Sequence, residues 1–385
     1  MLKNLIDMLV LIVLLIVASS PVRSQWLQQS TWAKENVNFY SVSFVNQQHG
    51  WIVGAGVGGP GEAFSAVTFR TTDGGTSWDQ MPQPTNTKLN DVFMLDTLTG
   101  WIVGDKGTIL KRYWKPGTVG IQWHPQPSGV IHNLRGVFFL DSQRGWTCGT
   151  NGIILATTDG GLTWTQQNIE AEPWQAFNDI HFTDAMNGWA VGWVNAKTTN
   201  GGANWTDVTL PSSEEMRDVH FTSNQHGVIV GRLGTILHTN NEGSSWQSVW
   251  SNTGVMFTGV DFANTLEGWA VGGGVYNGST WLDSARILHT TDGGLTWTQQ
   301  ASPVDKWIMD LSVVDRQHAW TVGNSGSIFR YNSPTSVSNE QAQGELEDPN
   351  YIDYDLLGRV AIVNGQGIRL RYWHGSGRTR LLFSP

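Results

Sequence analysis

The stretch Ala156–Gln167, "ATTDGGLTWTQQ", returns almost unchanged at His289–Gln300 as "HTTDGGLTWTQQ". Its core has the form T-x-(D/N)-x-G-x-x-W, and this eight-residue box occurs five times. The copies span residues 71–78, 157–164, 198–205, 239–246 and 290–297. Glycine permits the positive φ angles of a tight turn, and the tryptophan after the turn can pack in a core. The box therefore predicts a hairpin between two strands.

The third position of the box decides between a structural and a chemical role. It is acidic in three copies and an amide in two: Asp73, Asp159, Asp292, Asn200 and Asn241. Both kinds of side chain can accept hydrogen bonds from backbone N–H groups, but an amide cannot transfer a proton. Each box offers one carboxylate at most, whereas Ca²⁺ needs several oxygen ligands. We therefore interpret the boxes as structural turns.

Two other signals complete a repeat. A Gly-Trp pair such as Gly100-Trp101 is followed three residues after the tryptophan by another glycine, and seven versions of this segment occur. An alternating apolar segment such as Leu89/Val92/Met94 precedes each of them. Short alternating segments separated by Gly, Asn and Asp are typical of strands and turns. Four strands per unit, with a period of roughly 40–50 residues, predict a seven-bladed β-propeller.

The ends of the repeat region predict how the ring closes. The last unit has a third strand signal at Gly326–Phe329 but no box after Tyr331. The segment Trp26–Gln29, "WLQQ", matches the end of other units such as Trp297–Gln300. The N-terminal segment therefore supplies the missing fourth strand of the seventh blade, which removes the open sheet edges. We predict an all-β fold in which residues 25–332 form the propeller.

The composition argues against several classes of function. The chain has 385 residues, a net charge of −9 and no runs of Lys or Arg, so nucleic acid is not expected as a partner. The single cysteine, Cys148, allows neither an intrachain disulfide nor a Cys-based metal cluster. His181 and His220 occupy equivalent positions in neighbouring blades, but without a carboxylate at the same register they make a poor metal site. We expect no metal ion, no cofactor and a monomer.

The two ends of the chain differ from the repeat region. Residues 1–24 combine a basic start, an apolar run from Met8 to Val17 and small residues at Val22 and Ser24, as in a secretory signal peptide. The run is too short for a comfortable membrane span, so we do not expect an integral membrane protein; an uncleaved anchor helix is the alternative. Residues 333–350 form a polar linker, and residues 351–385 contain short β patterns separated by glycine.

Together, the "V.F", "GW.VG" and "TTDGG.TW" signals resemble the photosystem II stability/assembly factor family, whose BNR repeats contain the Asp-box hairpin. The resemblance covers nearly all of residues 25–332 and implies a seven-bladed, non-catalytic assembly chaperone. It also implies that membrane-protein subunits bind through a basic patch. The arginines Arg70, Arg112, Arg232, Arg286 and Arg330 lie in different blades, and no motif assigns them to that patch. Because many secreted bacterial proteins share the repeat, a photosynthetic role does not follow.

The C-terminal segment resembles a second family. The motif "YDLLGR" at Tyr354–Arg359, followed by Gly367-Ile368 and a basic, apolar finish, is similar to the sorting domains of type IX secretion cargo. This resemblance implies that the chain crosses the inner membrane by its signal and the outer membrane by its tail. We therefore expect a secreted or cell-surface protein; an ordinary small β appendage is the alternative.

A glycan-acting hydrolase of the sialidase type is the alternative function. Sialidases need three converging arginines, a Tyr nucleophile paired with Glu, and an acidic Asp. Arg70 precedes the first box, but other blades place residues such as Ala156 and Lys197 there, and no Tyr/Glu pair stands at equivalent strand starts. We therefore expect a binding or assembly module rather than an enzyme.

The loops opposite the boxes carry the candidate binding residues. Most loops between the second and third strands are tiny, but those of blades 1 and 6 are long, at 55–67 and 273–285. Because blades 1 and 6 both neighbour blade 7, these loops flank one sector of the ring. The candidate contact residues are Glu62, Phe64, Tyr276, Trp281, Asp283 and Trp307. Exposed aromatic residues favour a protein or glycan partner, whereas loops that merely tolerate insertions are the alternative.

Overall fold

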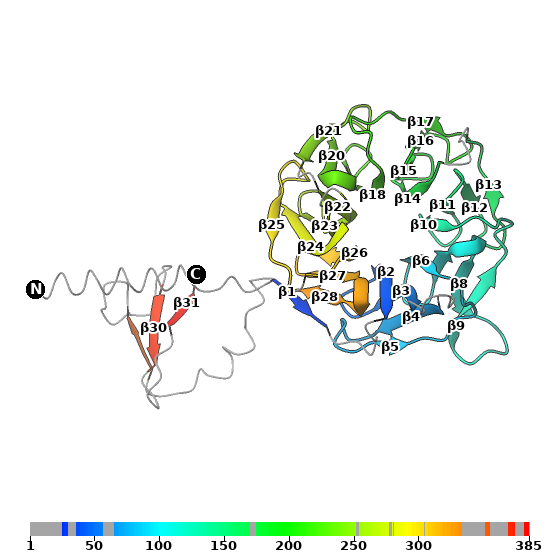
Figure 1. Ribbon diagram of the computed structural model, residues 1–385. Coiled ribbons are helices and arrows are strands. Elements are labelled where there is room, and N and C mark those ends of the chain that lie inside the picture. The colour runs from blue at the N-terminus through cyan, green and yellow to red at the C-terminus, as the bar shows by residue number, and fades with distance from the viewer. Residues whose placement is uncertain are drawn as a thin grey trace, which may run out of the picture. The chain divides into compact units, whose positions relative to one another are not determined.

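The structure is a computed structural model in which seven four-stranded antiparallel sheets are arranged in a ring (Figure 1). It describes residues 25–29, 36–56, 65–169, 175–251, 254–276, 279, 281–303 and 305–332, together with three strands between 351 and 384. The predicted all-β, seven-bladed propeller is confirmed. The predicted signal peptide at 1–24 and the linker at 333–350 lie outside the described residues.

Each blade has four strands, numbered along the chain. Blade 1 contains β2 (Val37–Phe44), β3 (Gly50–Gly56), β4 (Ser65–Thr71) and β5 (Asp79–Gln80). Blade 2 contains β6 (Leu89–Met94), β7 (Gly100–Gly104), β8 (Ile109–Trp114) and β9 (Ile121–Gln126). Blade 3 contains β10 (Leu134–Phe139), β11 (Gly145–Gly149), β12 (Ile154–Thr157) and β13 (Thr165–Gln166). Blade 4 contains β14 (Phe177–Phe182), β15 (Gly188–Gly192), β16 (Ala196–Thr198) and β17 (Thr206–Asp207).

The remaining blades follow the same order. Blade 5 contains β18 (Met216–Phe221), β19 (Gly227–Gly231), β20 (Thr235–Thr239) and β21 (Gln247–Ser251). Blade 6 contains β22 (Val255–Phe262), β23 (Gly268–Tyr276), β24 (Trp281–Thr290) and β25 (Thr298–Gln300). Blade 7 contains β26 (Ile308–Asp315), β27 (His318–Gly323), β28 (Ile328–Tyr331) and β1 (Trp26–Gln28). In a separate unit that begins at Pro334, β29 (Tyr351–Tyr354), β30 (Arg369–Trp373) and β31 (Leu381–Ser384) form a three-stranded antiparallel sheet.

The glycine before the strand tryptophan allows the first two strands of a blade to pack closely. A Cβ atom at Gly145 would collide with the ring of Phe139, and one at Gly188 would collide with the ring of Phe182. Each glycine thus leaves room for an aromatic ring at the end of the neighbouring inner strand. This steric need explains the "GW" signal of the repeat.

The innermost strand contains a bulge in every blade. In β6 the register with β7 shifts between Leu89 and Asp91, and the same shift occurs at the equivalent position of the other six inner strands. A bulge leaves one residue out of the ladder and redirects the neighbouring side chains. The bulged residues line the centre of the ring, as described below.

Aromatic rings join neighbouring blades. Trp101 of blade 2 stacks on Phe139 of blade 3 with ring centroids 3.4 Å apart, and the box tryptophan Trp164 meets Phe139 edge-on at 5.9 Å. The same arrangement recurs in Trp146–Phe182–Trp205 and in Trp320–Phe44–Trp78. Such pairs stabilise a seam beyond the burial of their surface.

The box adds hydrogen bonds to these seams. In blade 3, Asp159 Oδ1 accepts from the backbone of Thr163 at 2.9 Å and from Thr157 Oγ1 at 2.8 Å. The amide oxygen of Asn200 accepts the equivalent two bonds in blade 4. A carbonyl in the turn then accepts from the tryptophan Nε1 of the preceding blade: Trp101 to Gly160, Trp146 to Gly201 and Trp320 to Gly74, at 3.1, 3.0 and 3.0 Å. The box is thus a hydrogen-bonded turn that also ties one blade to the next.

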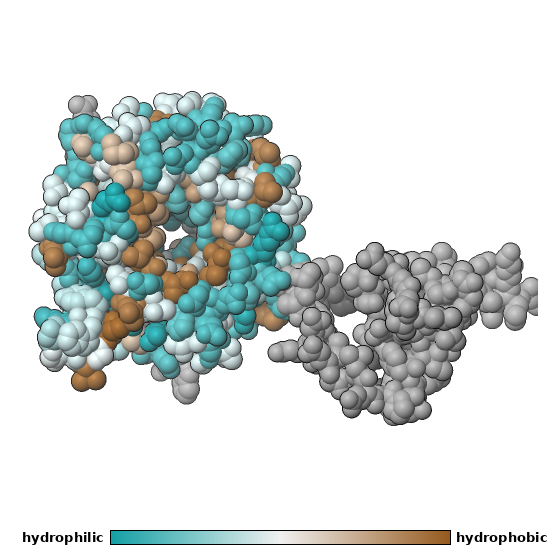
Figure 2. All heavy atoms as spheres, turned by 180° about the vertical axis from the view of Figure 1, so that it is seen from behind, coloured by the Kyte–Doolittle hydropathy of each residue, from teal (hydrophilic) through white to brown (hydrophobic). Residues whose placement is uncertain are grey.

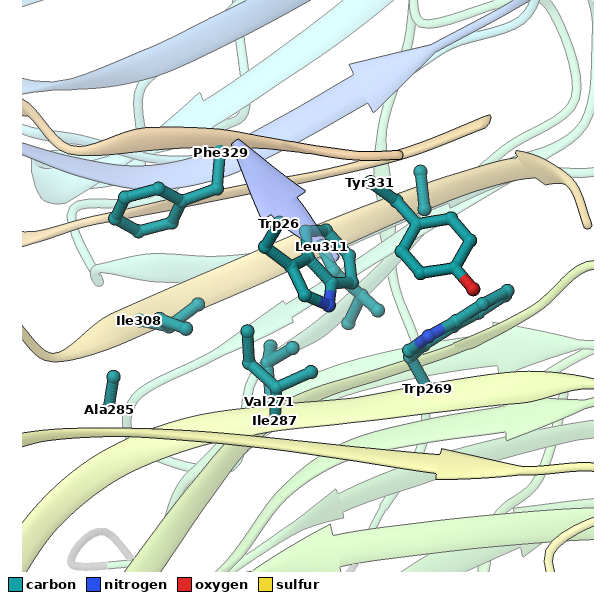
Figure 3. Packing of buried hydrophobic residues seen from close by; sticks show 10 residues of the cluster. Trp26, Trp269, Val271, Ala285, Ile287, Ile308, Leu311, Phe329 and Tyr331 are labelled. Carbon is teal, nitrogen blue, oxygen red and sulfur yellow. The ribbon is translucent and has the colours of Figure 1, made fainter. Parts of the chain in front are cut away.

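The ring closes as the sequence predicts. β1 pairs antiparallel with β28, from Trp26 opposite Tyr331 to Gln28 opposite Phe329. Trp26 is fully buried among apolar side chains of blades 6 and 7 (Figure 3). Its Nε1 donates to Gln300 Oε1 at 2.9 Å. The N-terminal strand therefore completes both the sheet of blade 7 and its seam with blade 6.

We expect Asp292→Ala to lower the free energy of unfolding by about 1–2 kcal/mol, because it removes the acceptor for Thr290 and Thr296. Asp292→Asn keeps the accepting oxygen, as in the natural Asn boxes, and should cost much less. Chemical denaturation of both variants measures the difference. Equal losses would show that the charge matters and would contradict a hydrogen-bonding role.

We expect Trp26→Ala to lower the free energy of unfolding by about 3–5 kcal/mol, because a fully buried ring is lost from the closing seam. Trp114→Ala is the matched control, since Trp114 is 59% exposed. Thermal and chemical denaturation give the comparison. If the two substitutions had the same small effect, closure by β1 would not contribute to stability.

Candidate functional site

A polar cavity of about 340 Å³ opens at the centre of the ring. The inner strands of all seven blades contribute to its walls. Lys88 and Asn133 precede two of these strands, and Asp105 lies in the turn η1 (Asp105–Gly107) that joins β7 to β8. These connections leave the blades opposite the box hairpins. The cavity, here called the channel mouth, is therefore on the face that we expected to bind a partner.

The bulge of each inner strand contains two successive residues; in five blades both line the channel mouth, and in blades 3 and 6, where the second is a glycine, only the first does. The residues at the first position are Tyr40, Asn90, Arg135, Asn178, Arg217, Thr258 and Met309. Those at the second position are Ser41, Asp91, Gly136, Asp179, Asp218, Gly259 and Asp310. We call the first set, together with Lys88, the rim. The four aspartates of the second set are called the carboxyl ring.

Two arginines of the rim are held by polar neighbours. Arg135 Nη1 donates to Asn178 Oδ1 at 2.6 Å, and Arg217 Nη1 lies 2.9 Å from Glu215 Oε1. Asn178 also donates to Glu215 at 2.9 Å, which links the two arginines through one network. Burial, followed by the charge of Arg217, lowers the pKa of Arg135. The network fixes both guanidinium groups at the edge of the cavity.

A lysine adds a third cation to the rim. Lys88 Nζ lies 3.8 Å from the centroid of the Tyr40 ring, in a cation–π contact. Burial lowers the pKa of Lys88, and the nearby Asp105 carboxylate opposes that shift. The rim therefore has three basic groups, Lys88, Arg135 and Arg217, beside two acidic groups, Asp105 and Glu215.

The carboxyl ring clamps neighbouring blades together. Asp91 Oδ2 accepts from Val137 N of the next blade at 2.8 Å, while its Oδ1 accepts from Ser41 Oγ of the preceding blade at 2.7 Å. The other members accept equivalent backbone bonds from the following blade: Asp179 from Val219, Asp218 from Val260, and Asp310 from Val42, at 3.1, 2.6 and 2.8 Å. These carboxyl oxygens are occupied by structural hydrogen bonds.

Burial also makes the carboxyl ring retain protons. It raises the pKa of Asp91 to about 6 and that of Asp218 to about 7. Burial and the neighbouring charge of Asp218 raise the pKa of Asp179 well above its usual value, and the two carboxyls hydrogen-bond to each other. Burial likewise raises the pKa of Asp310 well above its usual value. Part of the ring is therefore neutral near pH 7, and the charge of the mouth depends on pH.

A third tier lies deeper, formed by His181, His220 and Asp261 at one register of blades 4, 5 and 6. The two imidazole centroids are 5.1 Å apart, and His220 Nδ1 is 3.2 Å from Asp261 Oδ1. The expectation that no carboxylate shares the register of the histidines is therefore wrong. Burial lowers the pKa of His220 to about 4 and raises that of Asp261 to about 7, so the contact joins two neutral groups between those values. Within the described residues, no group of three His, Cys, Asp or Glu side chains is arranged to hold a metal ion.

The expected long loop of blade 6 is largely strand, which corrects the interpretation of residues 273–285. β23 extends to Tyr276 and β24 begins at Trp281, and these two residues pair across the hairpin. Asp283 lies within β24. The Asn-Gly pair in the sequence between the two strands is typical of a hairpin connection. Glu62 and Phe64 of blade 1 lie outside the described residues.

Trp307 is held against the blade 6 hairpin. It precedes β26, and its carbonyl accepts from Asn324 N at 3.0 Å. A Cβ atom on Gly273 would collide with the carbonyl oxygen of Ser284 and would lie 3.0 Å from both Cα and Cδ1 of Trp307, so glycine fits where Trp307 approaches the hairpin. The structure thus brings Trp307 to the blade 6 part of the predicted sector. Among the described residues, the mouth is lined by other side chains, and the binding role of the sector stays a prediction.

The basic rim is the part of the site that sequence reasoning missed. The arginines considered for a basic patch lie in third strands and turns of different blades, whereas Arg135 and Arg217 lie in inner strands at the residue after the first buried position. Aligning the seven inner strands would have placed both in one column. The bulge that turns this column toward the channel cannot be read from alternation alone, because alternation assumes a regular strand.

The opposite opening of the channel has a different character. Half-buried apolar residues directly follow the inner strand in four blades, at Val45, Leu95, Leu140 and Ala263, and blade 7 has Val314 near the end of β26. Figure 2, which views the face opposite to that of Figure 1, shows hydrophobic residues gathered around the opening. The polar mouth is therefore distinct from the apolar opening on the box face.

Comparison with known proteins shows which family the repeats resemble. The model of the photosynthesis system II assembly factor YCF48 family matches residues 115–213 and 202–302. The chain is a propeller with YCF48-type repeats. A YCF48 protein of Synechococcus sp. (strain CC9902), a photosystem II assembly lipoprotein, is 23% identical over 221 residues, which cover 54% of this chain and 64% of that protein. The chain thus matches somewhat less than two thirds of that relative's length.

Solved YCF48 structures share the fold. One, described as YCF48 bound to D1 peptide, superposes with a TM-score of 0.62 at 19% identity and covers 80% of this chain and 97% of that chain. YCF48 from Cyanidioschyzon merolae gives a TM-score of 0.59 at 16% identity, covering 81% and 99%. A streptogramin B lyase also gives 0.59 at 14% identity, covering 79% and 96%. At these identities the likeness establishes the propeller fold and not the activity.

The described residues contain no helix long and apolar enough to cross a membrane.

We expect the free energy of unfolding to fall as the pH rises from about 6.5 to 8. Asp218 and Asp261 have pKa values raised to about 7 in the folded protein, so the folded state releases protons that the unfolded state has already lost. His181 and His220, whose pKa values are lowered, oppose this trend only below about pH 6.5. Asp218→Asn should flatten the slope by up to about 1.4 kcal/mol per pH unit. Urea denaturation at several pH values measures it, and an unchanged slope would contradict the titration of Asp218.

Proposed function

We propose that this propeller with YCF48-type repeats is a non-catalytic binding module that holds an extended segment of a partner protein at the channel mouth. The observation that supports this most directly is the basic rim. Lys88, Arg135 and Arg217 surround a cavity of about 340 Å³, large enough for a few side chains. Their hydrogen-bond and cation–π contacts fix the charges in place before a partner arrives.

The charges favour an acidic or carboxylate-bearing segment. The three basic groups of the rim exceed the two acidic groups beside it, and partial protonation of the carboxyl ring, above all at Asp179 and Asp310, reduces the negative charge beneath them. Complementary charge steers association and fixes the orientation of a bound segment. A relative has been solved with a D1 peptide bound, so a peptide is a ligand type that the fold accommodates. We carry over only the class of ligand and not its identity.

The glycan-hydrolase alternative has less support. The carboxyl ring accepts backbone N–H bonds, which restrict the oxygens available for proton transfer to a substrate. Burial raises the pKa of Tyr40, opposite to what a tyrosine nucleophile needs. A fluorogenic sialoside assay tests the alternative directly. Turnover that Asp218→Asn abolishes would establish the hydrolase instead of the binding module.

We also propose that the protein is exported and acts outside the cytoplasm, secreted or at the cell surface. The signal-like residues 1–24 and the tail at 351–385 support this proposal through their sequence patterns. Expression of the full chain in a host with type IX secretion, followed by fractionation, tests it. Retention of the uncleaved chain in the cytoplasm would overturn it.

The binding proposal predicts a charge-dependent affinity for peptides. A fluorescein-labelled peptide rich in glutamate should bind the full chain more tightly than its lysine-substituted counterpart, as measured by fluorescence anisotropy. Affinity should fall with added salt and rise as the pH is lowered from about 7.5 to 6, because the carboxyl ring takes up protons. Reversal of two rim charges, Arg135→Glu with Arg217→Glu, should weaken binding at least about tenfold.

Lys115→Glu is the matched control, because it makes the same kind of charge change at an exposed position of the β8–β9 hairpin. It should leave the affinity nearly unchanged. Equal binding of the acidic and basic peptides, or equal losses in the rim and control variants, would rule out the rim as the binding site.

A further inference from the structure

The seam between blades 1 and 2 lacks the acceptor found at other seams. Trp101, Trp146 and Trp320 donate their indole N–H to a box of the following blade. Blades 2 and 7 have no box, and the tryptophans that face them are Trp51 and Trp269. Within the described residues, the Nε1 atoms of both are buried without a hydrogen-bond partner. Because the box is missing, the indole N–H groups at these two seams have no hydrogen-bond acceptor within the described residues.

The two seams replace the box in different ways. The position of the first box threonine is taken by Tyr331 in blade 7 and by Arg112 in blade 2. Tyr331 is neutral, packs 5.1 Å from Trp269 between ring centroids, and hydrogen-bonds to Gln300. Arg112 instead places a positive charge at the equivalent position of blade 2. One seam is closed by a neutral aromatic group and the other by a cation.

Arg112 is buried with most of its donors unused. It is only 2% exposed, and its guanidinium lies 5.6 Å and 5.9 Å from the ring centroids of Trp51 and Trp123. Nη1 donates to the carbonyl of Ile121 at 3.3 Å, while the buried Nε has no acceptor within the described chain. A buried guanidinium normally has a hydrogen-bonded anion, because burial of an uncompensated charge is costly.

Arg70 brings a second guanidinium to the same seam. Its Cζ lies 5.5 Å from the Trp51 centroid, and its buried Nε also lacks an acceptor within the described chain. The equivalent residue of blade 4, Lys197, donates to the carbonyl of Glu242 in the box of blade 5 at 2.6 Å. Arg70 has no such box carbonyl, because blade 2 has none.

The pair is a concentration of positive charge without a partner of opposite sign. Neither Arg70 nor Arg112 forms an ion pair with a described residue, unlike Arg144, Arg217 and Arg316. Burial, followed by the charge of Arg70, lowers the pKa of Arg112 to about 10, so the Arg112 guanidinium remains charged at neutral pH. Both guanidinium groups lie within 5.6 Å of the Trp51 ring centroid, so they are placed around the same side chain.

We propose that Arg70 and Arg112 bind one small oxyanion, of the sulfate or phosphate class, at the blade 1–blade 2 seam. The anion takes the place of the acceptors that a box provides elsewhere. Guanidinium groups present parallel N–H donors that match the oxygens of such anions. Neither arginine lines the channel mouth, whose walls come from the inner strands, the residues that precede them and Asp105 of η1.

Sulfate titration of the full chain tests the proposal at constant ionic strength, with chloride as the balancing ion. Calorimetry should detect a saturable site, and the melting temperature should rise by about 2–4 °C at ten times the dissociation constant. Arg112→Met keeps apolar contact with the two tryptophans but removes the charge, and it should weaken sulfate binding at least about tenfold. Arg70→Met, at a half-buried position, should do the same and serves if the first variant fails to fold.

Arg330→Met is the matched control. Arg330 also lies over a strand tryptophan, with its Cζ 5.8 Å from the Trp320 centroid, but it faces a blade that has a box. It should bind sulfate as the unmodified chain does. Repeating the titration in the Arg135→Glu, Arg217→Glu variant removes any sulfate binding at the rim. Acetate competition shows whether a planar carboxylate can replace the tetrahedral anion.

The possible outcomes decide the proposal. Saturable binding that depends on Arg70 and Arg112, persists in the rim variant and survives Arg330→Met supports it. Absence of saturable binding in the unmodified chain overturns it. Equal loss in Arg330→Met also overturns it, because a general effect of basic residues on tryptophan seams would then explain the result.

Discussion

The seam between neighbouring blades is the interaction on which this structure depends. A single blade leaves the faces of its sheet uncovered, so apolar burial is completed only by the blades on either side. Stacked rings such as Trp101 and Phe139 supply the apolar part of the seam, and the box carbonyl of Gly160 accepts the indole N–H. Each seam is formed by two blades, so an open ring would leave one sheet face of its first and last blades uncovered. The pairing of β1 with β28 completes blade 7 and closes the ring.

The inner end of the seam also builds the candidate site. The bulge in each inner strand places one residue on the rim, and in blades 2, 4, 5 and 7 the next residue belongs to the carboxyl ring. Asp91 illustrates the consequence, because it bonds to blades 1 and 3 while its surface faces the cavity. Stability and site charge are thus linked through the same carboxyl groups. Gly136 and Gly259 interrupt the ring of side chains where the next blade approaches most closely; a Cβ atom on either would lie 2.9 Å from that blade.

The sequence was sufficient for the ring but not for its interior. Box copies, Gly-Trp pairs and the "WLQQ" segment each have a local physical requirement, so blade number and closure could be predicted from them. The rim was missed because Arg135 and Arg217 carry no motif, and only the bulge turns them toward the channel. Asp261 was missed for a similar reason, since its partnership with His220 needs the alignment of two blades. The expectation of a loop in blade 6 was wrong because most blades have only a tiny turn there, so the repeat does not predict the pairing of Tyr276 with Trp281.

The two blades without a box show how a repeat can gain a property that its other copies lack. In blade 7, the lost turn is compensated by Tyr331 and the N-terminal strand, so the substitution serves closure. In blade 2, no second strand segment arrives from elsewhere, and Arg112 fills the space between Trp51 and Trp123. An apolar residue of similar length would fill that space at lower electrostatic cost. The charge of Arg112 is therefore not required by packing. For this reason, the position at which blade 2 departs from the repeat indicates ligand binding better than the positions that follow the repeat.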